Sequence, residues 1–373
     1  MDKLELRERL AEGTITRREV SRAMAAAGVA ALSIPLLAAP ARAGGEITYF
    51  TWAGYELPDF AQAYVDKYGG TPNYSIFGEE EEALQKMRAG YRPDIAHPCT
   101  YSVGRWRDAG LMKPIDVTRL ANYPDIWDDL KSISIAHADG QVWFVPWDWG
   151  NSSVLFRTDL VDAQYLEEES WGILFDERYA GRLGVYDAVD GAVIVAALYA
   201  GVADPFAMTD AEIETVREIM NKQRPLLRFY WTDQTAVEQG LASGEIVASY
   251  AWNASVVALK KQGVPVKYMN PKEGILTWVC GYMMLKEGPG DEQAAYDFMD
   301  AALAPESGRY LIDEYGYGHS NRKAFDLVTK ERLEELSISS PEVLFKQGIF
   351  FQPIEPSIRE KYIEMFEEVK AGA

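Results

Sequence analysis

Hydrophobic and polar residues alternate along the chain in blocks that predict a regular succession of strands and helices. Short runs rich in β-branched and aromatic residues, such as EITYFTW at 46–52 and RLGVYD at 182–187, are typical of strands. Longer segments with apolar residues at helical spacing, such as TDAEIETVREIMNKQ at 209–223 and SIREKYIEMFEEVKAG at 357–372, are typical of amphipathic helices. This alternation predicts an α/β fold with largely parallel sheets.

The middle of the chain predicts further strands around an unusual segment. QVWFVPW at 141–147 and SVLFRTD at 153–159 are typical of two separate strands, and ILTWVCGYMML at 275–285 is typical of another. In open α/β sheets, ligands bind beyond the carboxyl ends of the strands. Aromatic and acidic residues stand at or near these predicted ends: Trp52, Tyr101, Trp147, Asp148, Trp149, Asp187, Trp252 and Trp278.

These residue types fit a positively charged ligand. The faces of indole rings attract cations by about 0.5–2 kcal/mol each. The Asp148 carboxylate between two tryptophans is costly to bury without a partner, which favours a cationic ligand as that partner. A hydrogen bond to a neighbouring backbone amide is the alternative for Asp148. Asp190 also has two interpretations, because it could cap the following helix instead of contacting a ligand.

Residues 1–43 are predicted to be an export signal and not part of the fold. They contain Arg17-Arg18, an uncharged run at 23–39, and the small-residue sequence Ala41-Arg42-Ala43. The Thr-Arg-Arg start resembles a twin-arginine signal. We therefore expect a mature protein that begins near residue 44 and is soluble in the bacterial periplasm.

The net charge disfavours two classes of partner, and its alternative interpretation is that acidity merely aids solubility. The whole chain has a formal charge of −20, and residues 1–43 carry 7 Lys/Arg and 5 Asp/Glu, so the remainder has a charge of −22. Such a surface repels nucleic acids and anionic membranes.

The two cysteines, Cys99 and Cys280, could form a disulfide in an oxidising compartment if the fold brings their Cα atoms within about 7 Å.

Signatures of enzymes are missing from the sequence. The three histidines have no metal-ligand spacing, and neither a His-Glu-x-x-His nor a Gly-x-Ser-x-Gly motif occurs. No glycine-rich phosphate loop follows a predicted strand. The sequence therefore predicts no catalytic residues, no metal site and no cofactor, with an exported enzyme as a distant alternative.

The chain resembles the bacterial periplasmic spermidine/putrescine-binding proteins of ABC transporters. The resemblance covers nearly all of the predicted mature sequence. It rests on the order and spacing of several motifs: ITYFTWAGY, RPDIAHPCTY, DAGLMKPID, VWFVPWDWG, GRLGVYDAVD, GEIVASYAWNAS, NPKEGILTW, YGYGHSN and FFQP. It implies a periplasmic binding protein fold, in which two α/β lobes joined by crossing hinge strands close over the ligand.

The resemblance also implies a set of ligand contacts, with rings around the methylene groups and acids at the ammonium groups. The matching residues are Trp52, Tyr55, Tyr101, Asp187, Asp190, Trp252, Trp278, Tyr317 and Gln352. Three positions depart from the family pattern. Cys280 stands where the family has an aspartate, Cys99 where it has a serine, and Ala53 where it has a threonine. Asp148, beside Trp149, is the candidate to replace the lost acid. The resemblance places both cysteines on the pocket wall, where we expect a disulfide.

These observations predict a monomeric solute-binding component of an ABC importer. Lobe 1 is expected to contain residues 46–149 and 280–322, and lobe 2 residues 150–279 and 323–373. The expected partners are a polyamine such as putrescine or spermidine and the permease of the importer. The alternative keeps the fold but exchanges the ligand for another cationic amine, either a quaternary ammonium or a guanidino compound.

Overall fold

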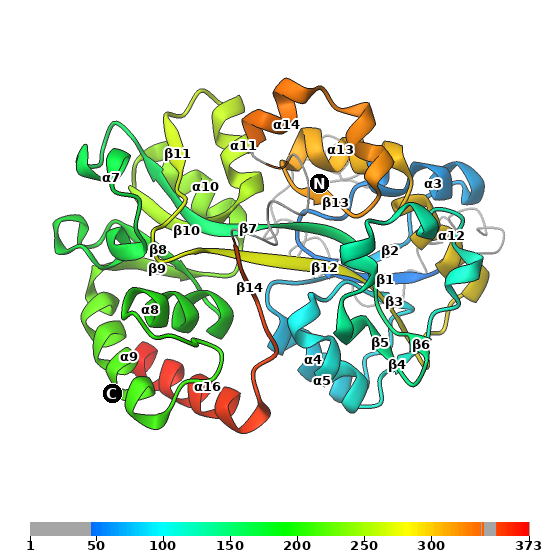
Figure 1. Cartoon of the computed structure of the whole chain (residues 1–373), viewed down its shortest axis with the longest axis horizontal. Coiled ribbons are helices and arrows are strands. Elements are labelled where there is room, and N and C mark those ends of the chain that lie inside the picture. The colour runs from blue at the N-terminus through cyan, green and yellow to red at the C-terminus, as the bar shows by residue number, and fades with distance from the viewer. Residues whose placement is uncertain (1–45, 337, 339–347, 373) are drawn as a thin grey trace, which may run out of the picture. The chain divides into compact units, whose positions relative to one another are not determined.

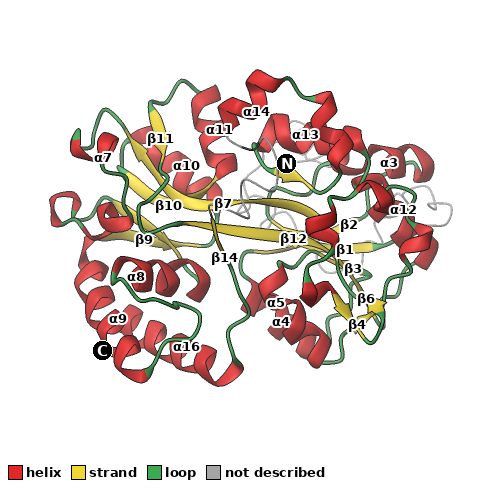
Figure 2. Cartoon of the chain, in the orientation of Figure 1, coloured by secondary structure: helices red, strands yellow, loops and turns green. Residues whose placement is uncertain are grey.

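The computed structural model describes residues 46–336, 338 and 348–372. The predicted export signal at 1–43 lies outside this part of the chain. Strands and helices alternate through the described residues (Figures 1 and 2), which confirms the predicted α/β class. Most predicted elements are present, because their hydrophobic periodicity matches the face that each element buries.

One mixed sheet forms the centre of the structure, and its strand order explains the position of the site. The order is β2 (Asn73–Phe77), β1 (Thr48–Trp52), β3 (Ile95–Ala96), β12 (Ile275–Leu285), β7 (Val145–Arg157), β10 (Ala248–Trp252), β8 (Leu183–Tyr186) and β9 (Leu227–Trp231). Strands β2, β1 and β3, the first strand group, are parallel to one another. Strands β10, β8 and β9, the second strand group, are also parallel.

Two long strands, β7 and β12, connect the first and second strand groups. They pair antiparallel with each other, while β12 pairs antiparallel with β3 and β7 with β10. Figure 1 shows both strands running through the middle of the described structure. The prediction of largely parallel sheets is therefore correct for the two strand groups and wrong for the centre, where the crossing strands introduce antiparallel pairs.

The two strands predicted at 141–147 and 153–159 are in fact mainly one strand, β7. It runs from Val145 to Arg157 without interruption, and nearly every residue is buried. Gly150 does not form a turn. It lies opposite Trp278 on β12, where a Cβ atom would come within 2.5 Å of the indole ring. The glycine is needed for this close packing. Because β7 continues through this segment, Trp147, Asp148 and Trp149 lie within a strand and not at a strand end.

Helices cover both strand groups, and short strands extend the sheet edges. The longer helices are α3 (Gln62–Tyr68), α4 (Glu80–Arg88), α5 (Thr100–Asp108), α9 (Asp210–Gln223), α10 (Gln234–Ser243), α11 (Asn253–Lys261), α12 (Glu292–Ala302), α13 (Pro305–Tyr315), α14 (Lys330–Leu336) and α16 (Pro356–Ala371). Shorter elements are α6 (Asp128–Lys131), α7 (Gln164–Glu167), α8 (Ile194–Tyr199), β4 (Met112–Lys113), β5 (His137–Ala138), β6 (Gln141–Val142), β11 (Val266–Tyr268), β13 (Gly318–His319) and β14 (Gly348–Phe350). In Figure 1, α3, α4, α5 and α12 lie around the first strand group, and α8, α9, α10 and α16 around the second.

Local capping fixes the start of two of these helices. In α9, the Thr209 hydroxyl accepts the Glu212 N–H while the Glu212 carboxylate accepts the Thr209 N–H, which forms a capping box. In α4, the Glu79 carboxylate accepts the N–H groups of Glu81 and Glu82. The run of four glutamates at 79–82 thus begins a helix, but one member, Glu80, is buried.

Candidate ligand-binding site

A cavity lies where the carboxyl ends of β1 and β10 meet the crossing strands. It contains about 540 Å³ of space outside the protein atoms, part of it open to solvent. Its lining consists of Trp52, Ala53, Tyr55, Cys99, Tyr101, Ser152, Tyr186, Asp190, Gln234, Tyr250, Trp252, Trp278, Cys280, Tyr317 and Phe351. Nine of these fifteen residues are aromatic, so the wall offers mainly ring faces and edges.

The rings come from both strand groups and meet across the cavity. Trp52 at the end of β1 and Trp252 at the end of β10 have ring centroids 6.4 Å apart at an interplanar angle of 66°. Trp278 on β12 meets the Tyr317 ring edge-on, with centroids 4.9 Å apart. Mutual packing of this kind holds the rings in fixed orientations. The site is therefore a preformed aromatic wall of rings that pack against one another.

The structure brings most of the predicted site residues together at this cavity. Trp52, Tyr55, Tyr101, Asp190, Trp252, Trp278 and Tyr317 are in its lining, together with both cysteines. Whether they contact a ligand stays a prediction. Four other predicted residues, Asp148, Trp149, Asp187 and Gln352, are absent from the lining.

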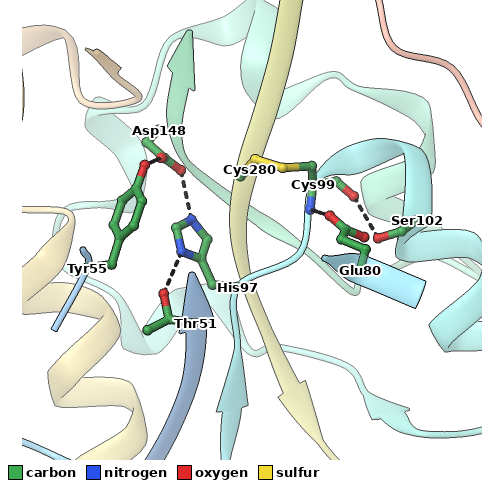
Figure 3. Close-up of a disulfide and its surroundings, with 8 residues drawn as sticks. All are labelled: Thr51, Tyr55, Glu80, His97, Cys99, Ser102, Asp148 and Cys280. Carbon is green, nitrogen blue, oxygen red and sulfur yellow. Dashed lines mark hydrogen bonds and ion pairs between the residues drawn. A yellow bond between two sulfur atoms is a disulfide. The ribbon is translucent and has the colours of Figure 1, made fainter. Parts of the chain in front are cut away.

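Asp148 has protein partners, which corrects its expected role as a counter-ion of the ligand. Tyr55 donates its hydroxyl hydrogen to Oδ2 of Asp148 at 2.5 Å, and His97 Nε2 donates to Oδ1 at 2.9 Å (Figure 3). Nδ1 of His97 lies 3.0 Å from the Thr51 hydroxyl. The side chains of His97 and Asp148 are fully buried. Asp148 therefore orients Tyr55, whose ring is in the cavity lining.

The phenol of Tyr55 remains protonated in this arrangement. Burial raises its pKa well above the ordinary value of 10, and the adjacent Asp148 charge raises it further. Tyr55 is thus a hydrogen-bond donor to Asp148 and presents its ring, not an ionised oxygen, to the cavity.

The other three residues outside the lining are occupied or exposed elsewhere. Trp149 donates its indole N–H to the His319 carbonyl at 3.3 Å and packs tightly over Gly318, where no Cβ atom would fit. The carboxylate of Asp187 accepts from Lys370 at 2.8 Å. Gln352 is exposed. Asp187 follows β8 as predicted, but Lys370 on the last helix provides the charge partner that had been expected from a ligand.

Asp190 is the one acid in the lining, and a buried arginine already neutralises it. Nη1 and Nη2 of Arg359 lie 3.2 and 3.1 Å from Oδ1 and Oδ2 of Asp190. Burial is the largest influence on Arg359 and lowers its pKa, but the charge of Asp190, the hydrogen bonds to Asp190 and the charge of Glu81 together raise the pKa above its ordinary value. The predicted alternative, a helix cap, is also not formed, because Ala188 is the N-cap and no side chain caps this helix. Asp190 instead forms a bidentate ion pair.

Six lining residues were not among the predicted contacts: Ala53, Ser152, Tyr186, Gln234, Tyr250 and Phe351. Two of them carried a recognisable signal. Tyr250 precedes Trp252 by two residues on β10, so the period of the strand places both on one face. Tyr186 is the last residue of β8, immediately before the predicted Asp187. Gln234 and Phe351 reach the cavity from α10 and from the residue after β14, and nothing in their local sequence indicates this position.

Cys99 and Cys280 form a disulfide in the cavity lining (Figure 3). Cys99 is the N-cap residue of α5, and Cys280 lies on β12, 181 residues later in the chain. Their Cα atoms are 3.8 Å apart, which is within the limit of about 7 Å for a disulfide. The bond attaches the start of α5 to a crossing strand and places two sulfur atoms in the wall of the cavity.

Among the described residues, no group of three or more His, Cys, Asp or Glu side chains could hold a metal ion. No helix in this part of the chain is long and apolar enough to cross a membrane.

Two strand groups linked by crossing strands, with a preformed aromatic cavity at their junction, define a solute-binding protein of the two-lobe type. The chain belongs to the family of bacterial extracellular solute-binding proteins, which it matches over residues 60–336. This membership confirms the predicted fold class and the predicted location outside the cytoplasm. It also assigns the chain to a family of solute-binding transport proteins rather than enzymes.

Individual relatives are distant but cover most of the chain. The chain is 24% identical over 356 residues to the spermidine/putrescine-binding periplasmic protein of Escherichia coli, covering 94% of this chain and 99% of the relative. It is 23% identical over 309 residues to the putrescine/agmatine-binding protein of Pseudomonas aeruginosa, covering 78% and 82%. The structure superposes on the spermidine/putrescine substrate-binding protein PotD of Streptococcus pneumoniae with a TM-score of 0.70 and 18% identity, covering 88% and 99%.

Proposed function

We propose that the protein is the periplasmic solute-binding component of an ABC importer and that it binds a polyamine, such as putrescine or spermidine, in the aromatic cavity. The observation that carries this proposal is the lining itself, because nine aromatic rings surround a space with a single acid. Ring faces attract ammonium groups and accommodate the methylene groups between them. The names of the two curated relatives, which include spermidine, putrescine and agmatine, support the same ligand class.

Closure of the two lobes over the ligand is part of this proposal. The proposed lobes are residues 46–149 with 280–322, which include the first strand group, and residues 150–279 with 323–373, which include the second. Two contacts between these parts support a closed arrangement. The Tyr186 hydroxyl donates to the Gly78 carbonyl at 2.8 Å, and Arg359 Nε lies 3.5 Å from Glu81. In the proposal the protein acts as a monomer, delivers its ligand to a permease and catalyses no reaction.

One observation favours the second candidate, a ligand with a single cationic group. A diamine needs acids at both ends of the cavity, whereas a single quaternary ammonium group needs rings and little else. Asp190 is the only acid in the lining and is already paired with Arg359. A monocation would therefore fit this lining without a second carboxylate.

Calorimetric titration of residues 44–373, refolded to remove bound ligand, distinguishes the two candidates. The panel is putrescine, spermidine, agmatine, choline and glycine betaine. One-to-one binding of a di- or triamine supports the polyamine proposal, and binding restricted to choline or glycine betaine supports the second candidate. If no compound binds, the proposed ligand class is wrong.

A matched pair of variants tests the position of the site. Tyr101 lies in the lining, whereas Tyr199 is 41% exposed and stacks on Phe175 outside it. We expect Tyr101→Leu to weaken binding of the ligand found in the panel about 5–30-fold, since a ring contact contributes about 1–2 kcal/mol. Tyr199→Leu should leave the affinity within about twofold. Equal effects of the two substitutions would contradict the assignment of this cavity.

A further inference from the structure

Glu80, which the proposed function does not use, is a buried acid directly behind the cavity wall. Its side chain belongs to α4 and is 1% exposed. Oε1 accepts the backbone N–H of Cys99 at 2.7 Å, and Cys99 is in the cavity lining (Figure 3). Oε2 is buried without a hydrogen-bond partner among the described residues. The Ser102 hydroxyl lies beside the carboxyl group, but it donates to the Cys99 carbonyl at 3.1 Å.

The charges around Glu80 are nearly all paired with one another. Arg105 lies 2.6 Å from Glu81, and Arg359 contacts both Glu81 and Asp190. The positive charges of these two arginines balance the negative charges of Glu81 and Asp190. Together with Glu80, these four residues form a charged layer in which Glu80 is the unpaired acid. The layer carries one surplus negative charge when Glu80 is ionised and none when it is protonated.

One more acid, Glu79, borders the layer but has compensation of its own. Its carboxylate accepts two backbone N–H groups at the start of α4, where the helix dipole favours negative charge. Its pKa is raised by burial. The groups that act on Glu80 are thus Ser102, Cys99 and Arg105 from the segment of α5, and Asp190 from the segment before α8.

The field of Glu80 reaches the cavity. Tyr101 and Tyr186 are both in the lining, and both have pKa values well above 10. Burial is the main cause for each, and the Glu80 charge adds to it. A negative charge that resists the ionisation of these phenols must attract a cation placed against the same rings.

Glu80 is also divided between its two forms near neutral pH. Burial raises its pKa to about 7, although Ser102, the Cys99 amide and Arg105 all favour the charged form. An ammonium group in the cavity would favour the charged form in the same way.

We propose that Glu80 is the counter-charge of the cavity: a cationic ligand held between the rings is matched by the ionised Glu80 carboxylate behind them, and binding is accompanied by release of the Glu80 proton. This inference rests on the proposed function, since it requires a cationic ligand in the aromatic cavity. Glu80 does not touch the ligand in this scheme and acts through the wall formed by Cys99 and Tyr101.

Calorimetry with putrescine in two buffers of different ionisation enthalpy tests the proposal near pH 7. We expect the wild-type protein to release a fraction of a proton per ligand. Its affinity should tighten about tenfold between about pH 5.5 and pH 8.5 for each pKa unit by which the ligand lowers the pKa of Glu80. Glu80→Gln should release no proton and bind at every pH with the weak affinity that the wild type has at low pH.

The matched control is Glu82→Gln, which changes an acid of the same helix whose side chain is 50% exposed and paired with Lys86. It should release the same proton fraction as the wild type. Wild-type binding without proton release, or unchanged release by Glu80→Gln, overturns the inference and leaves the proposed function intact. Failure of every panel compound to bind at any pH overturns both.

Discussion

The buried Glu80 carboxyl makes the stability of the folded protein depend on pH in a direction that can be calculated. Its pKa is raised from 4.5 to about 7 by burial, so the folded state holds the proton more tightly than the unfolded chain. The contribution to stability is fully present below about pH 4.5 and is lost as the pH rises through 7. Glu80→Gln removes this titration, while the amide oxygen can still accept the Cys99 N–H.

The size of the effect follows from the shift in pKa. A change from 4.5 to about 7 corresponds to about 3 kcal/mol between the two ends of the titration. Relative to the wild type, we therefore expect Glu80→Gln to gain about 3 kcal/mol of unfolding free energy between about pH 4.5 and pH 8.5. Any difference in packing between the two side chains adds a constant and does not change this slope.

Urea unfolding of the oxidised protein, followed by tryptophan fluorescence at several pH values, measures the difference. Glu82→Gln is again the control, because its half-exposed side chain should give an offset that varies by only a few tenths of a kcal/mol, as expected for a surface pair. If the difference between Glu80→Gln and the wild type is the same at pH 5 and pH 8, the charged form of Glu80 is not destabilised by burial. The counter-charge inference would then lose its electrostatic basis as well.

Two further predictions concern groups that hold the wall of the cavity. Arg359→Met should destabilise the protein by about 3–5 kcal/mol, because it leaves the buried Asp190 carboxylate unpaired; the double variant Arg359→Met/Asp190→Leu should recover most of this loss in the same unfolding assay. Replacing Cys99 and Cys280 by serine should cost about 2–5 kcal/mol, since the disulfide closes a loop of 181 residues. Thiol titration of the oxidised, unfolded protein should find no free thiol, and two reactive thiols would show that the bond is not formed.

The aromatic part of the site could be predicted because it depends on local pattern. Trp52 ends a strand of the first group and Trp252 ends a strand of the second, and ligands of open α/β sheets bind beyond the carboxyl ends of the strands. Tyr250 could have been added by the same rule, since it shares a strand face with Trp252. These positions follow from periodicity over a few residues, which a single sequence contains.

The charged part of the site could not be predicted, because the partner of each acid is far away in the chain. Asp187 and Asp190 are neutralised by Lys370 and Arg359, which are 183 and 169 residues later. Glu80 is one of four consecutive glutamates, a pattern typical of a solvated helix start, and its burial depends on how α5 packs against α4. Spacing along the sequence contains no information about such contacts.

Asp148 was misplaced for a different reason. The segment PWDWGNSS resembles a strand end because it contains a proline, a glycine and several small polar residues. In the structure, Gly150 serves the close approach of Trp278, and the strand continues. Turn-forming residues mark a break in the chain only when their conformation, and not their small size, is what the fold requires.

The continuity of β7 and β12 has a mechanical consequence. Ser152 on β7 and Trp278 on β12 are in the cavity lining, and the same two strands join the first and second strand groups. Any rotation of one group against the other must bend or twist backbone that carries these residues. The stiffness of this strand pair therefore enters both the energy of opening and the geometry of the wall, so a substitution that softens it should alter ligand residence time even where it removes no contact with the ligand.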